Sequence, residues 1–449
     1  MISFKYVLLK QNSFYIETYG CTANKADSYI ISTILKKSGF VQAPLDSAQF
    51  IIVNTCAVKE QTENKINARL GQINSLYGKD KNKHIIVAGC LPHIAPDYLK
   101  RIKKIIPNFS AIIDVKSIHI IDDVISKIRK GESNIISLSD NRLDKAKYLI
   151  DYPKGKITGI VPISEGCLGA CSYCCVKNAR GKLNCYSPQN ILKNVRWQLK
   201  RGIKQIYLTS QDCSIYQFRN TNLADLVERI TSIESLFYLR LGMLNPLFLK
   251  NSLDQLIRIL SSKKVYQFLH IPIQSGSDMI LKKMKRPYRI SDIIEPIDKL
   301  KRKYPNLTLS TDIICGFPTE SEYDFSKTIN LMKWLRPNIL NISKFTTRPN
   351  TAAKRMNQLD NRIIKDRAAR LSKVYRKLLK GSNQKWIGWK GDILILHRTN
   401  KKNQVFGRNF AYKNVFVDDY DDKMGKSIEV EVIKVKGYNL FAKLLQQNI

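Results

Sequence analysis

Short apolar runs alternate with longer segments of helical period in the first third of the chain. We predict strands at 13–17, 50–54 and 84–88, and helices at 23–37, 60–77 and 118–129. Strands that alternate with helices are typical of a parallel sheet with helices on its faces. The pattern therefore predicts an N-terminal α/β domain, with boundaries near residues 12 and 135.

The same alternation resumes after a polar stretch at 131–156, which we interpret as a linker. We predict strands at 157–163, 205–209, 238–241, 268–273, 307–314 and 339–344, and helices at 189–200, 323–335 and 363–379. Six such units over 152–380 predict a partial (β/α)6 barrel. The residues that follow the strands would line one mouth, where barrels carry their chemistry.

The end of the chain loses the helical period. We predict short strands at 392–396, 404–409, 415–417, 428–435 and 439–443. Five short strands over 384–446 indicate a small β-barrel, which is a frequent nucleic-acid-binding shape. The fold class is thus α/β, with a sheet domain, a partial barrel and a small C-terminal barrel.

The chain carries 75 Lys and Arg against 37 Asp and Glu, for a formal net charge of +38. This balance indicates a polyanionic partner, although part of the lysine excess is also explained by codon bias in an AT-rich genome. Two clusters are harder to explain by composition, and we expect them to bind phosphate. They are the five cations between Lys282 and Arg289, and the Lys and Arg residues of 361–380.

Basic and aromatic residues are interleaved in the predicted C-terminal barrel. They are Arg398, Lys401, Lys402, Arg408 and Lys413, with Phe406, Phe410 and Tyr412. Such residues can contact phosphates and stack on bases. The alternative is that the aromatic rings fill the barrel, and the sequence does not distinguish the two.

Hydropathy and cysteine usage limit the cellular setting. No stretch reaches 18 apolar residues, so we expect no membrane partner. Residues 1–10 are too short and too interrupted for a signal peptide. Ten Cys without a secretory signal predict a reducing cytoplasm and metal binding, not disulfides.

Three cysteines share one short loop with the spacing C-x3-C-x2-C: Cys167, Cys171 and Cys174. Three thiolates can hold three corners of a four-iron cluster and leave one iron open for a substrate. A closed structural zinc site normally takes four protein ligands. The alternative interpretation is three buried or zinc-binding cysteines.

Three further cysteines each follow one of the first predicted strands: Cys21, Cys56 and Cys90. The carboxyl ends of parallel strands meet at one sheet edge, where such folds bind ligands. The pattern therefore predicts a second site with three thiolates. The alternative is that these are ordinary small core residues.

With both cysteine sets, the chain resembles a radical S-adenosylmethionine (SAM) methylthiotransferase from about residue 13 to its end. The matching segments are 18–21, 54–58, 88–90, 165–174, 179–181, 239–243, 270–278 and 311–320, and the tail resembles the RNA-binding barrel called TRAM. The resemblance implies two [4Fe-4S] clusters and S-adenosyl-L-methionine as cofactors. The cluster on the cysteine loop would cleave SAM to a radical that takes hydrogen from the substrate, and the other would deliver the sulfur.

The resemblance also implies contacts to SAM, an electron donor protein and a tRNA anticodon loop as partners. The expected contacts are Tyr173, Ser210, Gln211, Asp212, Arg240, Gln274 and Gly316. Gln211 departs from the family pattern, which often has Glu there. Cys175, Cys185, Cys213 and Cys315 are additional thiols, and we expect Cys175 to point away from the cysteine loop.

Three subfamilies share this plan. Segments 179–181 and 313–317 look most like the archaeal and eukaryotic enzymes that methylthiolate C2 of threonylcarbamoyladenosine at position 37 of tRNA. The alternatives are isopentenyladenosine in tRNA or an aspartate of a ribosomal protein. An alternative of another class is a non-catalytic RNA-binding metalloprotein.

Overall fold

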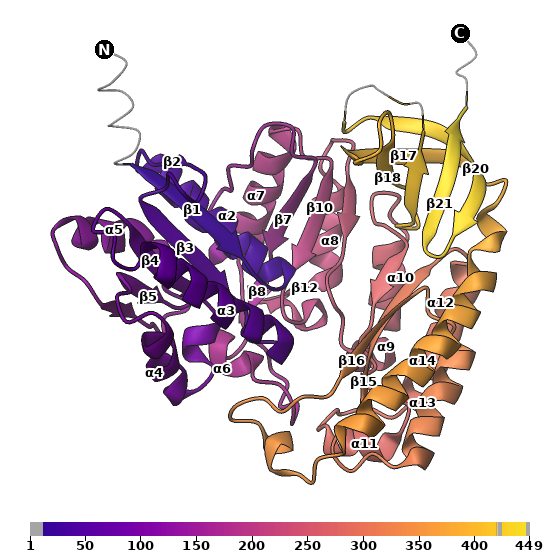
Figure 1. Cartoon of the computed structure of the whole chain (residues 1–449). Helices are drawn as coiled ribbons and strands as arrows, with labels where there is room; N and C mark the ends of the chain where they lie inside the picture. The colour runs from indigo at the N-terminus through magenta and orange to yellow at the C-terminus, as the bar shows by residue number, and fades with distance from the viewer. Residues whose placement is uncertain (1–11, 419, 421–423, 446–449) are drawn as a thin grey trace.

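The computed structural model describes residues 12–418, 420 and 424–445 (Figure 1). The prediction that residues 1–10 form no signal peptide lies outside the described residues. An N-terminal α/β unit lies beside a middle α/β unit, and a small barrel sits at one end of the middle unit (Figure 1). No helix in the described part of the chain is long and apolar enough to cross a bilayer.

The N-terminal unit is a six-stranded parallel sheet in the order β2-β1-β3-β4-β5-β6. Its strands are β1 (Ser13–Thr18), β2 (Val41–Gln42), β3 (Phe50–Thr55), β4 (His84–Gly89), β5 (Ala111–Ile113) and β6 (Ile135–Ser137). Its helices are α2 (Thr22–Lys37), α3 (Glu60–Tyr77), α4 (Pro96–Ile105) and α5 (Ile121–Arg129). The three predicted strands and three predicted helices are confirmed, except that the last helix opens with a 3-10 turn at Ile118–Ile120. Every residue of β3 is buried, as expected for a central strand covered on both faces.

The prediction of a linker at 131–156 is wrong for residues 135–137, which form a strand. It also does not foresee that a later residue of the segment is buried. Residues 135–137 form β6, which pairs with β5 at the sheet edge. Farther on, Lys145 has only 2% of its surface exposed. The segment is polar because its buried side chains are charges that pair with other elements. Composition alone does not distinguish such a segment from a linker whose charges face water.

The middle unit has six parallel strands in chain order. They are β7 (Thr158–Pro162), β10 (Gln205–Thr209), β13 (Tyr238–Arg240), β14 (Phe268–His270), β15 (Thr308–Cys315) and β16 (Ile339–Lys344). They form two three-stranded sheets, β13-β10-β7 and β14-β15-β16, which a parallel bridge between Met243 and His270 connects. All six strands lie where the pattern predicts them, but β14 stops at His270, because Pro272 cannot donate to a ladder.

Helices cover the outer side of these strands. They are α7 (Pro188–Lys200), α8 (Leu223–Thr231), α9 (Pro246–Asn251), α10 (Leu253–Leu260), α11 (Asp278–Lys283), α12 (Ser291–Lys303), α13 (Glu322–Leu335) and α14 (Asn361–Ser382). The short pair β8 (Ser164–Glu165) and β9 (Asn184–Cys185) flanks α6 (Val176–Arg180) beside the N-terminal sheet (Figure 1). Apolar residues of α2, β3, β7 and α7 belong to one hydrophobic core, so the N-terminal and middle units are packed as one body.

The C-terminal strands close into a barrel in the order β17-β18-β19-β21-β20, which confirms the predicted shape. They are β17 (Lys390–Arg398), β18 (Val405–Arg408), β19 (Asn414–Val417), β20 (Ser427–Lys436) and β21 (Asn439–Leu444). Aliphatic residues such as Ile393, Val415 and Leu440 fill the interior with Trp386. Closure pairs every strand edge within the barrel.

Candidate functional site

The first thiol set is Cys21, Cys56 and Cys90. Cys21 is three residues past the end of β1, and Cys56 and Cys90 directly follow β3 and β4. These strands are neighbours and run parallel, so the three cysteines lie along one sheet edge. Cys56 and Cys90 are buried, whereas Cys21 is exposed. Burial raises the pKa of the Cys90 thiol; with the opposing effect of the Arg180 guanidinium and the smaller effects of the Cys21 and Cys56 thiols, the net pKa is about 12.

A glycine makes room for this set. Gly20 has a φ of +108°, and a Cβ built on it would stand 2.7 Å from Cys56 Sγ. Any side chain at this position would displace the Cys56 thiol, because carbon and sulfur cannot approach so closely. The tight turn after β1 therefore depends on glycine.

Cys167, Cys171 and Cys174, the second thiol set, lie on the loop between β8 and α6. The loop is fixed by backbone bonds: Cys167 N donates to Gly181 O at 3.3 Å, and Ser172 N donates to Met284 O at 3.0 Å. Arg286 Nη1 lies 3.5 Å from Cys171 Sγ, while Arg286 Nη2 donates to Pro272 O at 3.0 Å. The α11 region therefore holds the thiol loop in place.

Cys175 joins the two sets. Its side chain is 1% exposed, and its thiol donates to Ala57 O at 3.1 Å, next to Cys56. Arg348 Nη2 donates to the same carbonyl at 2.8 Å. Cys175 therefore contacts the N-terminal unit, and the expectation that it points away from the second thiol set stays a prediction.

Each donor set consists of three free thiols, the ligands that iron–sulfur clusters use. All ten cysteines are free of disulfides. Among the described residues, no three His, Cys, Asp or Glu side chains are grouped tightly enough to hold one metal ion. In a cluster each thiolate binds a different iron, so its cysteines stand farther apart than the ligands of one zinc ion.

Four buried charges connect the two thiol sets. Lys145 Nζ lies 2.7 Å from both Asp27 Oδ1 and Glu165 Oε1, and Arg180 lies 2.7 Å from Asp27 Oδ2 and 2.6 Å from Glu165 Oε1. All four side chains are at most 7% exposed. Burial alone raises the pKa of Asp27, but Lys145 and Arg180 outweigh it and hold that pKa below its usual value.

This charge network reaches both sites. Arg180 Nη2 donates to Asn24 Oδ1 at 2.5 Å, and the Cys90 thiol lies 3.5 Å from the same oxygen. Glu165 stands two residues before Cys167. Glu165 and Arg180 lie in segments that match the family, but the sequence does not show that they pair with Asp27 and Lys145, because Arg180 and Asp27 are 153 residues apart.

The expected SAM contacts after β10 divide between two roles. Gln211 Oε1 accepts from Gly166 N at 2.7 Å, so this side chain braces the second thiol loop. The buried Asp212 carboxylate accepts from Ser214 N and Asn245 N, at 3.0 and 3.2 Å, and so braces its own turn. Ser210 Oγ lies 3.4 Å from Cys213 Sγ.

The other expected contacts are spread around the strand ends. Tyr173 packs edge-on against Phe317. Gln274 adopts a left-handed conformation, with φ +74°, and its backbone pairs with β15. Gly316 also has a positive φ, and a Cβ there would meet Ile364 of α14 at 2.4 Å.

Arg240 is not brought to the second thiol loop. Its guanidinium lies over the rings of Tyr207, Phe268 and Tyr412 at 5.1, 4.8 and 5.6 Å. Tyr412 comes from the C-terminal barrel and is 8% exposed. Arg240 thus takes part in seating that barrel on the middle unit, and its contact with SAM stays a prediction.

A polar group on β14, β15 and β16 was also missed. His270 Nε2 lies 2.9 Å from Asp312 Oδ1, and Asn341 Nδ2 donates to the same oxygen at 2.7 Å. Burial raises the pKa of Asp312, but His270 and Asn341 lower it, as does Lys59 of the N-terminal unit, so the net pKa is below its usual value. A direct contact joins the N-terminal unit to the segment that follows β16, since Arg348 Nη2 lies 2.7 Å from Glu63 Oε2 of α3.

The C-terminal barrel carries four rings on its outer face, which we call the aromatic stripe. His397, Phe406, Phe416 and Phe441 are successive cross-strand partners on β17, β18, β19 and β21. Neighbouring ring centroids are 4.7, 5.3 and 5.5 Å apart. Their flanking residues, such as Val405 and Val415, point inward. Of the rings named from the sequence, Phe406 is 9% exposed, Phe410 packs against the barrel core, and Tyr412 packs against Tyr266 and Phe268 of the middle unit. The filling role is therefore favoured for Phe410 and not for Tyr412.

Family models match two parts of the chain. Residues 13–112 match the uncharacterized protein family UPF0004, and residues 161–332 match the radical SAM superfamily. A protein of Pyrococcus horikoshii, named as a probable threonylcarbamoyladenosine tRNA methylthiotransferase, is 40% identical over 414 residues, which are 90% of this chain and 93% of the relative. The chain belongs to this methylthiotransferase family.

Relatives of the family extend to animals and agree with the predicted subfamily. The human threonylcarbamoyladenosine tRNA methylthiotransferase is 32% identical, across 93% of this chain and 71% of its own length. Among solved structures, the radical SAM methyltransferase TsrM of Kitasatospora setae matches with a TM-score of 0.55 over 76% of this chain and 75% of its own. At 11% identity that likeness concerns the fold alone.

Proposed function

We propose that this methylthiotransferase acts on C2 of N6-threonylcarbamoyladenosine at position 37 of tRNA, in the anticodon loop. The observation that carries the proposal is the pair of incomplete thiol sets, one on each side of the interface between two units with a common core. Family membership supplies the substrate class. Isopentenyladenosine and a ribosomal-protein aspartate have no comparable support.

Each thiol set would hold one [4Fe-4S] cluster: Cys167, Cys171 and Cys174 one, and Cys21, Cys56 and Cys90 the other. When bound, the cluster on Cys167, Cys171 and Cys174 would supply reductive cleavage of S-adenosyl-L-methionine, and the cluster on Cys21, Cys56 and Cys90 would supply sulfur. The chain itself fixes the geometry. Gln211 and Arg286 hold the second thiol loop, and the buried charge network fixes the distance between the two sets. Reactive groups held at one distance gain the rate advantage of proximity.

We infer that the middle unit is the partial (β/α)6 barrel of radical SAM enzymes and that the closed C-terminal barrel is a TRAM module for tRNA. Six parallel strands in chain order and the aromatic stripe support these assignments. An electron donor protein is required to reduce the cluster that cleaves SAM. A cytoplasmic location stays a prediction.

The decisive experiment is mass spectrometry of nucleosides in total tRNA from cells with and without this protein. We expect 2-methylthio-N6-threonylcarbamoyladenosine to disappear and its unthiolated precursor to accumulate. Restoring the wild-type gene should recover the product. An unchanged level of this nucleoside, or loss of a methylthiolated isopentenyladenosine instead, would contradict the proposed substrate.

A further inference from the structure

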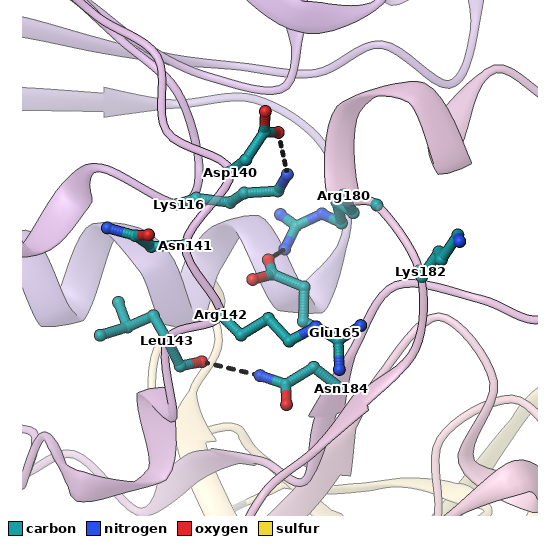
Figure 2. Close-up of a pocket in the computed structure, with 10 residues that line it drawn as sticks. Lys116, Asp140, Asn141, Arg142, Leu143, Glu165, Arg180, Lys182 and Asn184 are labelled. Carbon is teal, nitrogen blue, oxygen red and sulfur yellow. Dashed lines mark hydrogen bonds and ion pairs between the residues drawn. The ribbon is translucent and has the colours of Figure 1, made fainter.

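A polar pocket of about 280 Å³ opens between the two units, away from the expected SAM contacts (Figure 2). Three segments form its walls: Lys116 after β5, residues 140–143 before β7, and the β8–β9 region. In Figure 2 the side chains of Lys116 and Arg142 enter the space in front of the Arg180–Glu165 pair, and Lys182 lies at the rim.

The pocket has an excess of positive charge. Arg180 and Glu165 on its floor belong to the balanced buried network and contribute no net charge. Lys116 pairs at 3.2 Å with Asp140, whose carboxylate is 97% exposed. Arg142 and Lys182 form no ion pair or hydrogen bond within the described part of the chain. Two cations therefore remain without a counter-charge around a concave, polar space.

The floor of the pocket adjoins both thiol sets. Arg180 donates to the same Asn24 oxygen that the Cys90 thiol approaches, and Gly181 O accepts from Cys167 N at 3.3 Å. A base whose C2 lies between the thiol sets must direct its N6 substituent to a nearby part of the same interface, because C2 and N6 flank N1 on one edge of adenine. The threonylcarbamoyl substituent ends in a carboxylate.

We propose that the pocket binds an anionic oxygen group of the RNA substrate, namely the carboxylate of the threonylcarbamoyl group, with Arg142 as its main partner. This inference rests on the proposed function and adds the basis of specificity. An arginine fork binds a carboxylate through two parallel hydrogen bonds, and the buried charge network behind it provides a rigid floor. An isopentenyl substituent has no charge and cannot form these bonds, so the pocket favours the threonylcarbamoyl group over it.

A backbone phosphate of the anticodon loop offers the same anionic chemistry, so the test separates the two sources. Synthetic anticodon stem-loop RNAs carry either threonylcarbamoyladenosine or the same nucleoside with its carboxylate changed to a primary carboxamide. Dissociation constants are measured with the reconstituted enzyme without turnover, for wild type, Arg142→Ala and Arg142→Lys. Arg196→Ala is the control, since Arg196 is an exposed arginine on α7 outside the pocket.

Wild type should bind the carboxylate RNA about ten- to a hundred-fold more tightly than the carboxamide RNA. Arg142→Ala should bind the two RNAs equally, Arg142→Lys should recover part of the preference, and Arg196→Ala should keep it. If Arg142→Ala weakens both RNAs alike and keeps the preference, the site binds a phosphate and the carboxylate assignment is overturned. No effect of Arg142→Ala on either RNA overturns the site altogether.

The same RNAs separate this inference from the proposed function. If the wild-type enzyme methylthiolates the carboxylate RNA but Arg142→Ala still prefers that RNA, the role of the pocket is refuted and the proposed function stands. A wild-type enzyme that does not methylthiolate that RNA at all refutes the proposed substrate.

Discussion

Lys413 is a lysine buried at the base of the C-terminal barrel. Its side chain is 5% exposed, and its Nζ donates to Asn383 Oδ1 at 3.1 Å. Burial, together with the nearby Lys385, lowers the pKa of this amine from 10.5 to about 7. The barrel therefore contains a cation that is costly to keep charged at neutral pH.

The lowered pKa of Lys413 predicts a pH-dependent stability. Between about pH 7 and 10.5 the unfolded chain binds this proton and the folded chain does not, so the free energy of unfolding rises with pH in that window. Replacing Lys413 with Met should remove this rise and stabilise the protein at pH 7 by about 1–3 kcal/mol. Thermal unfolding of the full chain from pH 6 to 10 measures both effects.

Lys436→Met, at an exposed position of β20, is the control for the change at Lys413. Equal pH slopes for wild type and Lys413→Met would contradict the assignment.

The sequence predicts the position of some site residues well and the side-chain direction of others poorly. Cys21, Cys56 and Cys90 could be placed at one edge because each follows a strand, and parallel strands end together. Arg240 ends β13, yet its guanidinium lies over rings from β10, β14 and the turn between β18 and β19. Position in the chain fixes where a Cα lies, but the direction of a long side chain depends on partners that local patterns do not contain.

At the scale of elements, the turn after β1 depends on Gly20. Gly20→Ala should displace the Cys56 thiol and lower the iron content by about half, from about eight to about four per chain. Gly39→Ala is a matched control, since Gly39 also has a positive φ of +84° but a Cβ added there would meet no atom within 4 Å. That control should cost about 1 kcal/mol of stability and keep its iron. Iron analysis after anaerobic reconstitution measures the difference, and full iron in Gly20→Ala would refute the role of this turn.

The aromatic stripe predicts how the C-terminal barrel binds RNA. Phe416→Leu with Phe441→Leu keeps the apolar cover of the outer face but removes two stacking surfaces. Stacking of a base on an aromatic ring is worth about 1–3 kcal/mol, so tRNA affinity should fall at least about tenfold. Ile433→Ala, at a 54% exposed apolar position on β20, is the control. Binding measured by filter retention that is unchanged in the double variant would rule out the stripe as an RNA surface.

Elements with a clear apolar period could be predicted almost to the residue, as with β10 and α3. The stripe could not, because Phe416 and Phe441 are far apart in sequence and become neighbours only through the parallel pairing of β19 with β21. The 131–156 segment failed for a related reason. Its charges look solvated in the sequence, and only the fold shows that Lys145 is paired with Asp27 and Glu165.

At the scale of the whole molecule, the positive charge has two uses. In the 361–380 cluster, Arg367 is buried against Glu320 at 2.8 Å, while Lys365, Lys373 and Lys377 are exposed on α14. In the 282–289 cluster, Arg286 turns inward to Cys171. The predicted phosphate contacts are therefore restricted to the exposed members, and the inward arginines hold the fold and the thiol loop.

The two thiol sets should have separable functions, which triple variants can test. The triple change to Ala at Cys167, Cys171 and Cys174 should remove about half of the about eight iron atoms per chain. It should also abolish the formation of 5′-deoxyadenosine from SAM. The triple change at Cys21, Cys56 and Cys90 should remove the other half and end methylthiolation, but spare SAM cleavage, because the second thiol loop keeps its own braces. Cys185→Ala, a half-buried thiol outside both sets, should change neither. If the variant without the first set still thiolates RNA, sulfur does not pass through the N-terminal sheet edge, and the common core would then serve stability alone.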